Sequence, residues 1–584
     1  MLYLLYGDTM KNKVIINSLL FLSFIVLISI SFNPSNASTN KSTEYGIRVN
    51  SEGSFTLNGT YFKAMGVNGF RFLSDEFILF KGQSGASSGY QAGDYVKRFQ
   101  MLKDYNIPFA RIPFGSWGDI SYDVFDMSAD HHEYFAISDK LVKAAEEYNI
   151  GIIIDFFWLH TRIPTRNGEY FADLANPNSK TIQYQTKFIN AIINRYKNSP
   201  AIWGYEIGNE YNLNMDYYDA KTNNAKNFIT TNELADYYKN ISNKIAAVDS
   251  TRLITTGDSM VRKEAYSLYT VTKDIYYSNH KPWSAGSKGT NFTTFDDYKS
   301  MIKKLNGGAI NTLSLHFYEQ DSFKPSGIGG TIDIYLELAK KTKQGVYLGE
   351  FGGGFKSESD AKTTFDKEMA SITKRNIQLS SPWLSSSDGY YMKQNASGRQ
   401  FYYDSLKDYF FGKMKAYNDP YKGVYSNAWS AWKKSISVNS NIGYKITKTS
   451  NYTNETKDNT VSSYYLTGDK VSITIPANND YDVKSIVVKT ESGSDVSVSN
   501  NQFTMPNDNV VVTVNAEKKA QQVKVGDVNN DGQINSMDYV LIRKSIMKQV
   551  NLSDTQKQAA DLNTDGKVTT QDYVLLKIII MNSK

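Results

Sequence analysis

Short apolar runs alternate with longer amphipathic segments between residues 45 and 435. Eight of these runs have the length and the β-branched and aromatic content of strands; they span residues 62–67, 109–112, 151–156, 202–207, 253–256, 312–316, 346–348 and 377–383. After the third run, Ser179 offers an N-cap to a helix whose apolar residues keep helical spacing. Alternating strands and helices are typical of a parallel sheet, so we predict an α/β fold, a (β/α)8 TIM barrel with insertions, over residues 38–435.

The pattern changes after residue 435 to period-two alternation in a segment rich in Thr, Val, Ser and Asn, as at 471–475 and 510–514. This alternation predicts a small all-β domain with flanking linkers over residues 436–522. Such a domain serves either as a spacer or as a carbohydrate-binding module. The sequence shows no trio of aromatic residues set out for stacking on sugars, which favours the spacer.

The beginning of the chain has the pattern of a targeting signal. Lys11 and Lys13 precede an apolar run from 14 to 32, and small residues follow at Ser35 and Ala37. This order predicts a signal peptide over residues 1–37, with Met10 as a plausible start, and hence a secreted protein that is free of the membrane after cleavage. The alternative is an uncleaved membrane anchor, because the run is nearly long enough to span a bilayer.

Composition narrows the class of protein further. The chain has 584 residues, of which 41% are apolar and 21% charged, so it should fold into two to four globular domains. Its net charge of +6 is spread over the whole chain without a basic arm or helix, which argues against a nucleic-acid partner. It contains no cysteine, so a secreted form would depend on packed cores and bound metal for its stability.

A twelve-residue motif occurs twice near the end of the chain, at 527–538 and 561–572, and each copy leads into an apolar helix. Oxygen-bearing side chains at fixed positions, with Gly at the sixth, are typical of an EF-hand calcium loop. We therefore predict two bound Ca²⁺ ions with a structural role and no cofactor for catalysis. The predicted ligand positions are Asp527, Asn529, Asp531, Gln533, Asn535 and Asp538, and in the second copy Asp561, Asn563, Asp565, Lys567, Thr569 and Asp572.

The two copies depart from an EF-hand, because the twelfth position is Asp and only one helix follows each loop. With these features residues 523–584 resemble a type I dockerin. The resemblance implies a cohesin domain of a scaffoldin as partner and an extracellular, cellulosome-associated location. It also implies that the partner is read by Ser536 and Met537 in the first copy and by Thr570 and Gln571 in the second.

Two of the predicted strands run into a carboxylate. Glu210 follows the fourth strand, and Glu350 follows the seventh. Because active sites of such barrels lie at the carboxyl ends of the strands, we expect the two acids at one rim. Two carboxyl groups facing one substrate are what cleavage of a glycosidic bond requires. Glu206, on the same strand face as Glu210, is expected to be a buried polar residue with its partners inside the barrel.

Arg111 at the second strand, Asn209 before Glu210, His316 and Tyr318 at the sixth strand and Trp383 at the eighth accompany these two acids. With them the chain resembles glycoside hydrolase family 5 and its clan of cellulases and mannanases, over about residues 45–435. The resemblance implies that Glu210 is the general acid/base and Glu350 the nucleophile of a retaining mechanism. Arg111 would then keep Glu350 charged, while burial and the nearby negative charge would raise the pKa of Glu210. Substrate contacts would come from Arg111, Asn209, His316, Tyr318 and Trp383.

The sequence departs from that family at two places: Tyr211 stands where Pro usually follows the Asn-Glu pair, and the third strand lacks its usual His before His160. The prediction is a cellulosomal endo-β-glycanase acting on a β-1,4-linked plant polysaccharide, a β-glucan or a β-mannan. Two alternatives stay open, a carbohydrate-binding protein with little or no turnover and a transglycosylase that uses the same acids.

Overall fold

The computed structural model describes residues 44–583 except 88, 116–117, 214, 216–228, 262–294, 319–326, 353–356, 384–405, 454–455, 459–463, 478–479 and 520–521. The predicted signal peptide, residues 1–37, lies outside the described residues. Among the described residues, no helix combines the length and the apolar character needed to cross a bilayer.

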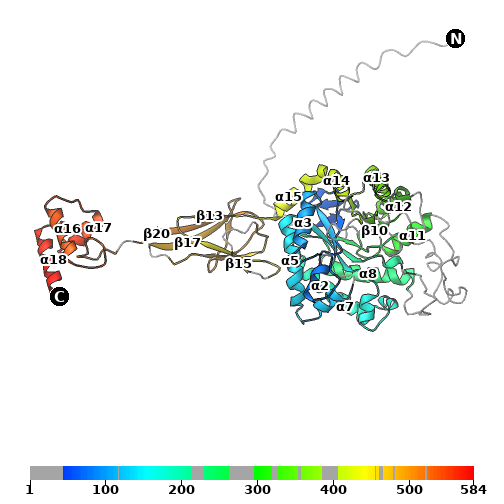
Figure 1. Cartoon of the computed structure of the whole chain (residues 1–584), viewed down its shortest axis with the longest axis horizontal. Helices are drawn as coiled ribbons and strands as arrows, with labels where there is room; N and C mark the ends of the chain where they lie inside the picture. The colour runs from blue at the N-terminus through cyan, green and yellow to red at the C-terminus, as the bar shows by residue number, and fades with distance from the viewer. Residues whose placement is uncertain are drawn as a thin grey trace, which may run out of the picture. The chain divides into compact units, whose positions relative to one another are not determined.

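Parallel strands flanked by helices make up the first and largest part of the chain (Figure 1). One sheet has the strand order β5-β6-β7-β8-β9 and the other the order β10-β11-β12-β4. The strands of the first are β5 (Val67–Asn68), β6 (Phe109–Pro113), β7 (Gly151–Phe157), β8 (Ile202–Gly208) and β9 (Leu253–Thr255). Those of the second are β10 (Thr312–Phe317), β11 (Gly345–Phe351), β12 (Leu379–Ser380) and β4 (Ala64–Met65).

A strand is present in each of the eight predicted runs. The strands form two parallel sheets, however, and not the closed barrel that the sequence predicts. Gly66 alone separates β4 from β5, so the chain itself joins the sheets there. Between β9 and β10 the side chain of Asn311 replaces a strand ladder: its Oδ1 accepts from the Ile254 amide at 2.9 Å. In the described structure the three residues of β9 pair with β8 alone, and one backbone bond, from the Asn311 amide to Ile254 O at 3.2 Å, accompanies the side-chain contact.

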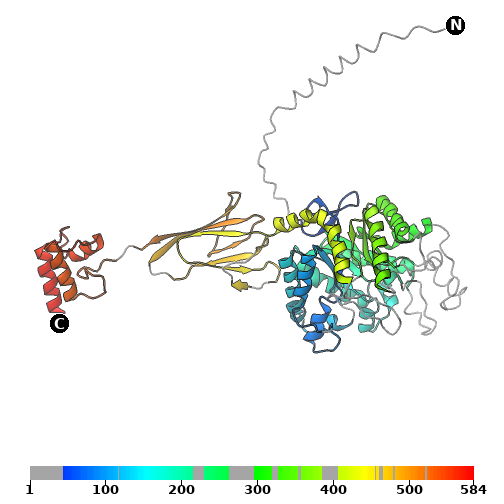
Figure 2. The same ribbon diagram turned by 45° about the horizontal axis from the view of Figure 1, so that its top comes forward.

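Helices surround the strands (Figures 1 and 2). Ser179 caps one of them as predicted, because its hydroxyl accepts from the Ile182 amide at 3.1 Å. The longer helices are α3 (Tyr95–Asp104), α5 (His132–Tyr148), α7 (Lys180–Tyr196), α8 (Thr231–Val248), α11 (Phe295–Leu305), α12 (Gly327–Thr342), α13 (Glu358–Lys374), α14 (Lys407–Asn418) and α15 (Lys422–Trp432). The shorter elements are β1 (Ile47–Val49), β2 (Phe55–Leu57), β3 (Thr60–Tyr61), α2 (Ser74–Phe80), α4 (Ile120–Phe125), α6 (Arg162–Arg166), η1 (Phe171–Ala175), η2 (Tyr211–Leu213) and η6 (Asp419–Tyr421).

The centre of this part is tightly packed, since every residue of β6, β7, β8, β10 and β11 is buried. Gly151 shows how tight the packing is: a Cβ added there would lie 1.9 Å from the Trp203 ring. Strands buried on both faces read as the near-continuous apolar runs seen in the sequence. The polar residues that do occur on these strands therefore need partners inside the fold.

Between residues 436 and 519 the described elements are all strands. They form two four-stranded sheets, of order β13-β20-β17-β18 and β15-β14-β16-β19, around a core that includes Val471, Phe503 and Val512. Their bounds are β13 (Ile436–Ser440), β14 (Lys445–Thr449), β15 (Thr456–Asp458), β16 (Lys470–Thr474), β17 (Tyr481–Thr490), β18 (Asp495–Val496), β19 (Gln502–Thr504) and β20 (Val510–Lys518). That this segment is a separate all-β domain stays a prediction, as do the boundaries at 37, 435 and 522.

The end of the chain has three helices, α16 (Ser536–Ile546), α17 (Asp554–Ala560) and α18 (Thr570–Asn582). Each copy of the twelve-residue motif leads into α16 or α18. The two copies meet through Tyr539 and Tyr573, whose rings stack with centroids 4.0 Å apart, and through a small core that contains Ile542 and Leu576.

Candidate active site

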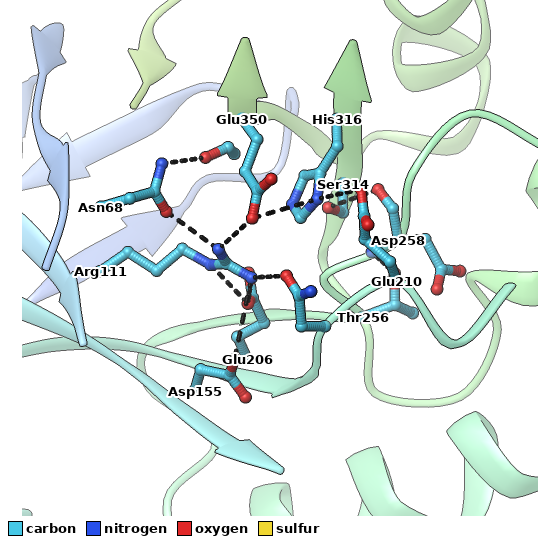
Figure 3. Close-up of polar contacts among 12 residues, drawn as sticks. Asn68, Arg111, Asp155, Glu206, Glu210, Thr256, Asp258, Ser314, His316 and Glu350 are labelled. Carbon is cyan, nitrogen blue, oxygen red and sulfur yellow. Dashed lines mark hydrogen bonds and ion pairs between the residues drawn. The ribbon is translucent and has the colours of Figure 1, made fainter. Parts of the chain in front are cut away.

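Arg111 lies at the centre of a buried polar cluster at the carboxyl ends of the strands (Figure 3). Its Nη1 donates to Glu350 Oε1 at 2.7 Å and to Asn68 Oδ1 at 2.9 Å. Its Nη2 donates to Asn209 Oδ1 at 2.8 Å, and its Nε to Glu206 Oε1 at 2.6 Å. One guanidinium thus holds side chains from β5 and β8 of the first sheet and from β11 of the second.

Glu350 accepts a hydrogen bond on each carboxyl oxygen. Arg111 donates to Oε1, and the Tyr318 hydroxyl donates to Oε2 at 2.5 Å. The residue is only 4% exposed. The guanidinium and the phenol, each donating to a different oxygen, hold this buried carboxyl group in one orientation.

Glu210 has different surroundings, although it lies close by. Its side chain keeps 22% exposure, and burial raises the pKa of this carboxyl, with Arg111 opposing the shift. Burial rather than a neighbouring negative charge is the cause, which corrects part of the expectation from the sequence. Its backbone has φ +54°, a strained conformation for a residue other than glycine, and its amide donates to Gly257 O at 2.9 Å.

His316 connects the two acids. Its Nδ1 lies 3.2 Å from Glu210 Oε1 and 3.6 Å from Glu350 Oε1. One carboxyl oxygen of each acid and a His316 ring nitrogen all lie within 4.8 Å of one another. Burial lowers the pKa of His316 to about 3, so the imidazole is neutral near pH 7.

The donor set of Glu210, His316 and Glu350 is one that could hold a metal ion. The Arg111 guanidinium, however, already bonds to Glu350 Oε1 and would face any added cation. Two carboxyls in different surroundings, one paired with a cation and one with a raised pKa, instead suit a nucleophile and a proton donor.

Aromatic rings flank the cluster. The Trp383 ring stacks on Trp158 with centroids 5.7 Å apart, and both rings contact Phe70. The Trp383 amide donates to Phe351 O at 2.8 Å. Because Phe351 directly follows Glu350 in the chain, this bond holds the Trp383 backbone close to Glu350. Trp158 also covers Arg111, whose guanidinium carbon lies 5.0 Å from its ring centroid.

Sequence reasoning missed Asn68 and Trp158. Asn68 accepts from Arg111 and donates to the carbonyl oxygens of Gly349, Ser381 and Pro382, at 3.0 to 3.2 Å. The signal for Asn68 was a polar residue directly after the first apolar run. The signal for Trp158 was an aromatic residue at the end of the third apolar run.

The two departures from the family pattern have a structural account. The Tyr211 hydroxyl donates to Phe157 O at 3.0 Å, and its ring is buried against Tyr237. His160 lies under η1 with its ring edge-on to Tyr211, and burial lowers its pKa to about 4. Neither residue displaces Glu210 or Glu350 from the cluster.

Glu206 is buried, as expected, but only one of its oxygens is satisfied. Oε1 accepts from Arg111, whereas Oε2 has no hydrogen-bond partner among the described residues. The expectation of full satisfaction is therefore wrong. The register partners of Glu206 are Asp155, which is also an acid, and Thr255, whose hydroxyl has no hydrogen-bond partner among the described residues either.

The two predicted calcium loops adopt the same conformation, and this conformation suits the binding of a metal ion. Asp527 accepts on both oxygens from the Asp531 and Gly532 amides, and Asp561 does the same in the second copy. Gly532 and Gly566 take φ +87° and +81°, the turn that the sixth position needs. The side chains at positions one, three and five of each copy therefore converge on one side of the loop.

The remaining predicted ligand positions differ in what they can offer. Asp538 and Asp572 are fully buried and accept backbone N–H bonds on both oxygens. The side chains of Asn535 and Thr569 cap α16 and α18, so these positions suit a ligand that acts through water. Gln533 and Lys567 suit a ligand through the backbone carbonyl. The four predicted partner-reading residues, Ser536, Met537, Thr570 and Gln571, are all exposed at the starts of these two helices.

Two family models match parts of the chain. The family model for cellulase (glycosyl hydrolase family 5) matches residues 79–389, and the model for the dockerin type I domain matches residues 525–581. Both model matches lie within the regions expected from the sequence resemblances.

Two curated relatives are each a mannan endo-1,4-beta-mannosidase A. That of Hypocrea jecorina is 28% identical over 127 residues, which is 20% of this chain and 26% of the relative. That of Podospora anserina is 27% identical over 197 residues, or 32% and 44%. The chain thus matches less than half the length of either relative.

Solved structures with a similar trace include an endo-1,4-beta-mannanase from Rhizomucor miehei. It has 15% identity and a TM-score of 0.42, covering 65% of this chain and 99% of that one. An endo-1,4-beta-D-mannanase from Thermotoga petrophila has 15% identity and a TM-score of 0.42, covering 62% and 100%.

Proposed function

Since the chain belongs to glycosyl hydrolase family 5 and carries a type I dockerin domain, we propose that it is a secreted, cellulosomal endo-β-glycanase. Its substrate in this proposal is a β-1,4-linked plant polysaccharide, cleaved with retention of configuration. The names of the two curated relatives favour a β-mannan over a β-glucan.

One observation carries the proposal: Glu210 and Glu350 face each other with carboxyl oxygens less than 4.8 Å apart, in unlike surroundings. Carboxyl groups roughly 5 Å apart suit retention, because the wider spacing of inverting enzymes leaves room for a water molecule. The same geometry counts against a protein that only binds sugar.

In the proposed mechanism Glu350 Oε attacks the anomeric carbon while the bond to the leaving oxygen breaks. Glu210 donates its proton to that oxygen, and the Arg111 and Tyr318 hydrogen bonds hold Glu350 in line. Water then attacks the glycosyl-enzyme ester, giving its proton to Glu210 and releasing Glu350. Neutral His316 spans the two acids and keeps their separation as charge moves between them.

Substrate contacts follow from the groups left available around the pair. Asn209 uses its oxygen to accept from Arg111, which leaves its amide protons to bind a sugar hydroxyl, the 2-hydroxyl in this proposal. Trp383, braced by Trp158, offers its ring as a stacking surface for the sugar at the cleavage position.

We further infer that the two loops of the dockerin bind one Ca²⁺ each and dock onto a cohesin through Ser536, Met537, Thr570 and Gln571. Bound calcium would supply the free energy that holds the acidic loops closed. This arrangement would place the hydrolase in a scaffold beside other enzymes.

Release of reducing ends by the full chain, measured on a panel of mannans and glucans, tests the proposed activity. Glu350→Gln should abolish release, whereas Glu337→Gln, a change at an exposed glutamate of α12, should leave it intact. Retention on polysaccharide without release would instead identify a binding protein. Products longer than the substrate would identify a transglycosylase.

A further inference from the structure

Beneath the proposed catalytic pair, two further carboxyls lie side by side on adjacent strands. Asp155 on β7 and Glu206 on β8 are register partners, so their side chains point to the same face. Both residues are fully buried. Neither acts directly in the mechanism proposed above.

One oxygen of each acid, Asp155 Oδ2 and Glu206 Oε2, has no hydrogen-bond partner among the described residues. Their other oxygens are satisfied: Asp155 Oδ1 accepts from the Phe157 amide at 3.0 Å, and Glu206 Oε1 accepts from Arg111. Asp155 Oδ2 has only the ion pair with Arg111 Nη2 at 3.8 Å. Ionised oxygens that are so poorly compensated cost much free energy in a dry interior. A proton held between the two acids removes that cost, because it gives one of them a donor.

Charge in the cluster leads to the same result. Among the residues that the structure describes, Arg111 is the one cation that contacts these acids, and it is also paired with Glu350. Other acids nearby are Glu210 and Asp258, while the Tyr122, Tyr211, Tyr237 and Tyr347 hydroxyls are neutral at working pH. With Asp155, Glu206 and Glu350 all ionised, a single guanidinium would face three negative charges in a buried site.

We propose that Asp155 and Glu206 share one proton and act as a positioning pair for Arg111, leaving this guanidinium free to hold Glu350. If the pair lost that proton, its second negative charge would draw Arg111 away from Glu350 and weaken the alignment of the nucleophile. The role in catalysis rests on the proposed function, whereas the shared proton does not.

The direction of the acid shifts agrees with the geometry. Burial, and then the charge of Glu206, raise the pKa of Asp155 well above its ordinary value. Burial raises the pKa of Glu206 to about 7 despite the hydrogen bonds from Arg111. Two coupled acids of this kind release their protons in two separate steps.

Infrared difference spectroscopy of the full chain at pH 6 tests the shared proton without reference to activity. A Glu210→Gln background removes the contribution of that carboxyl group to both kinds of band. In this background Asp155→Asn should remove one carboxylic-acid C=O band and no carboxylate band, because Glu206 then pairs with Arg111 as the anion. The double variant Asp155→Asn/Glu206→Gln should remove one band of each kind.

Loss of two carboxylate bands and no C=O band in the double variant would overturn the proposal, and so would loss of two C=O bands. If Asp155→Asn does not fold, as judged by circular dichroism, Glu206→Gln provides the same count of bands. The single C=O band of the pair should also disappear in the Glu210→Gln protein as the pH is raised, and its persistence at pH 10 would contradict the proposal.

The pH profile of kcat/KM tests the positioning role. In Asp155→Asn the alkaline limb should move up by about 1 pH unit, because the pair can no longer gain its second charge. Glu206→Gln should lower kcat about tenfold with little change in KM, a typical cost of losing an outer hydrogen-bond partner. An unmoved alkaline limb would overturn the positioning role. Infrared bands as expected with no activity in any variant, wild type included, would overturn the proposed function and leave the shared proton intact.

Discussion

Glu210 and Glu350 are the same amino acid in two environments, and the difference between them is local. Glu350 is held by a guanidinium and a phenol, whereas Glu210 is partly exposed and is bonded weakly to a neutral imidazole. The sequence indicated both residues, because each carboxylate closes an apolar strand. The family resemblance indicated unlike environments through Arg111 beside Glu350. The contacts of Asn68 with Arg111 and of His316 with both acids could not be predicted, because these residues lie far apart in the chain.

Replacing Glu210 with Ala should separate proton donation from nucleophilic attack. Cleavage of polysaccharide should fall by about 10²–10⁴-fold, whereas aryl glycosides with activated leaving groups, which need no proton, should lose far less. Steady-state kinetics on both substrate types measures this difference. Glu350→Ala should lose both activities, and equal losses for the two substrate types in Glu210→Ala would remove this residue from the acid role.

Asp258 provides a pH-dependent contribution to stability. Burial raises its pKa to about 7, and the Tyr238 hydroxyl donates to it. Its folded pKa lies above the unfolded value of about 3.9, so its contribution is present at low pH and is lost as the pH rises through 7. Asp258→Asn should therefore gain about 2–3 kcal/mol in free energy of unfolding relative to wild type between pH 5 and pH 8.

Urea denaturation at the two pH values measures this change. Asp104→Asn, on the exposed face of α3, serves as the matched control and should show no comparable pH dependence. A constant difference between wild type and Asp258→Asn across the pH range would show that Asp258 is ionised throughout.

At the scale of elements, apolar runs and helical spacing located all eight predicted strands and the Ser179 cap, because both depend on residues near in sequence. The break between β9 and β10 was not foreseeable in this way. It depends on Asn311, which bonds to Ile254 across the fold through both its side chain and its backbone amide, in place of a continuous ladder.

Gly151 provides a test of packing at this scale. Gly151→Ala, at the start of β7, should destabilise the fold by about 2–3 kcal/mol, because the added methyl group overlaps the Trp203 ring and the strand is fixed on both edges. Gly412→Ala, on the exposed face of α14 where a Cβ meets nothing within 4 Å, should be neutral or stabilising by up to about 1 kcal/mol. Urea denaturation compares the two, and equal effects would mean that β7 shifts to accept the methyl group.

At the scale of the whole molecule, the sequence showed where composition changes and where a motif repeats, so the dockerin could be recognised without a structure. The domain boundaries are harder to predict, because a change in alternation indicates element type and not independence. Their test is limited proteolysis.

Chelation of calcium should separate the two proposed activities of the full chain. Excess EDTA should abolish binding to a cohesin, whereas release of reducing ends should continue. Without calcium, the acidic side chains of the loops at 527–538 and 561–572 repel one another and the loops open. Surface plasmon resonance and a reducing-end assay on the same sample measure both. Cohesin binding that survives chelation would refute the dockerin's dependence on calcium.

Arg111 joins side chains from two sheets that no continuous ladder connects on the β9 side. The geometry of the active site therefore depends on how these two sheets are aligned. A shift of one sheet against the other separates Glu350 from Glu210 even if each sheet stays intact. Turnover should respond to such a shift before any spectroscopic signal of secondary structure does. Loss of activity should therefore report misalignment of the two sheets, and heat inactivation should begin below the temperature at which the helices melt.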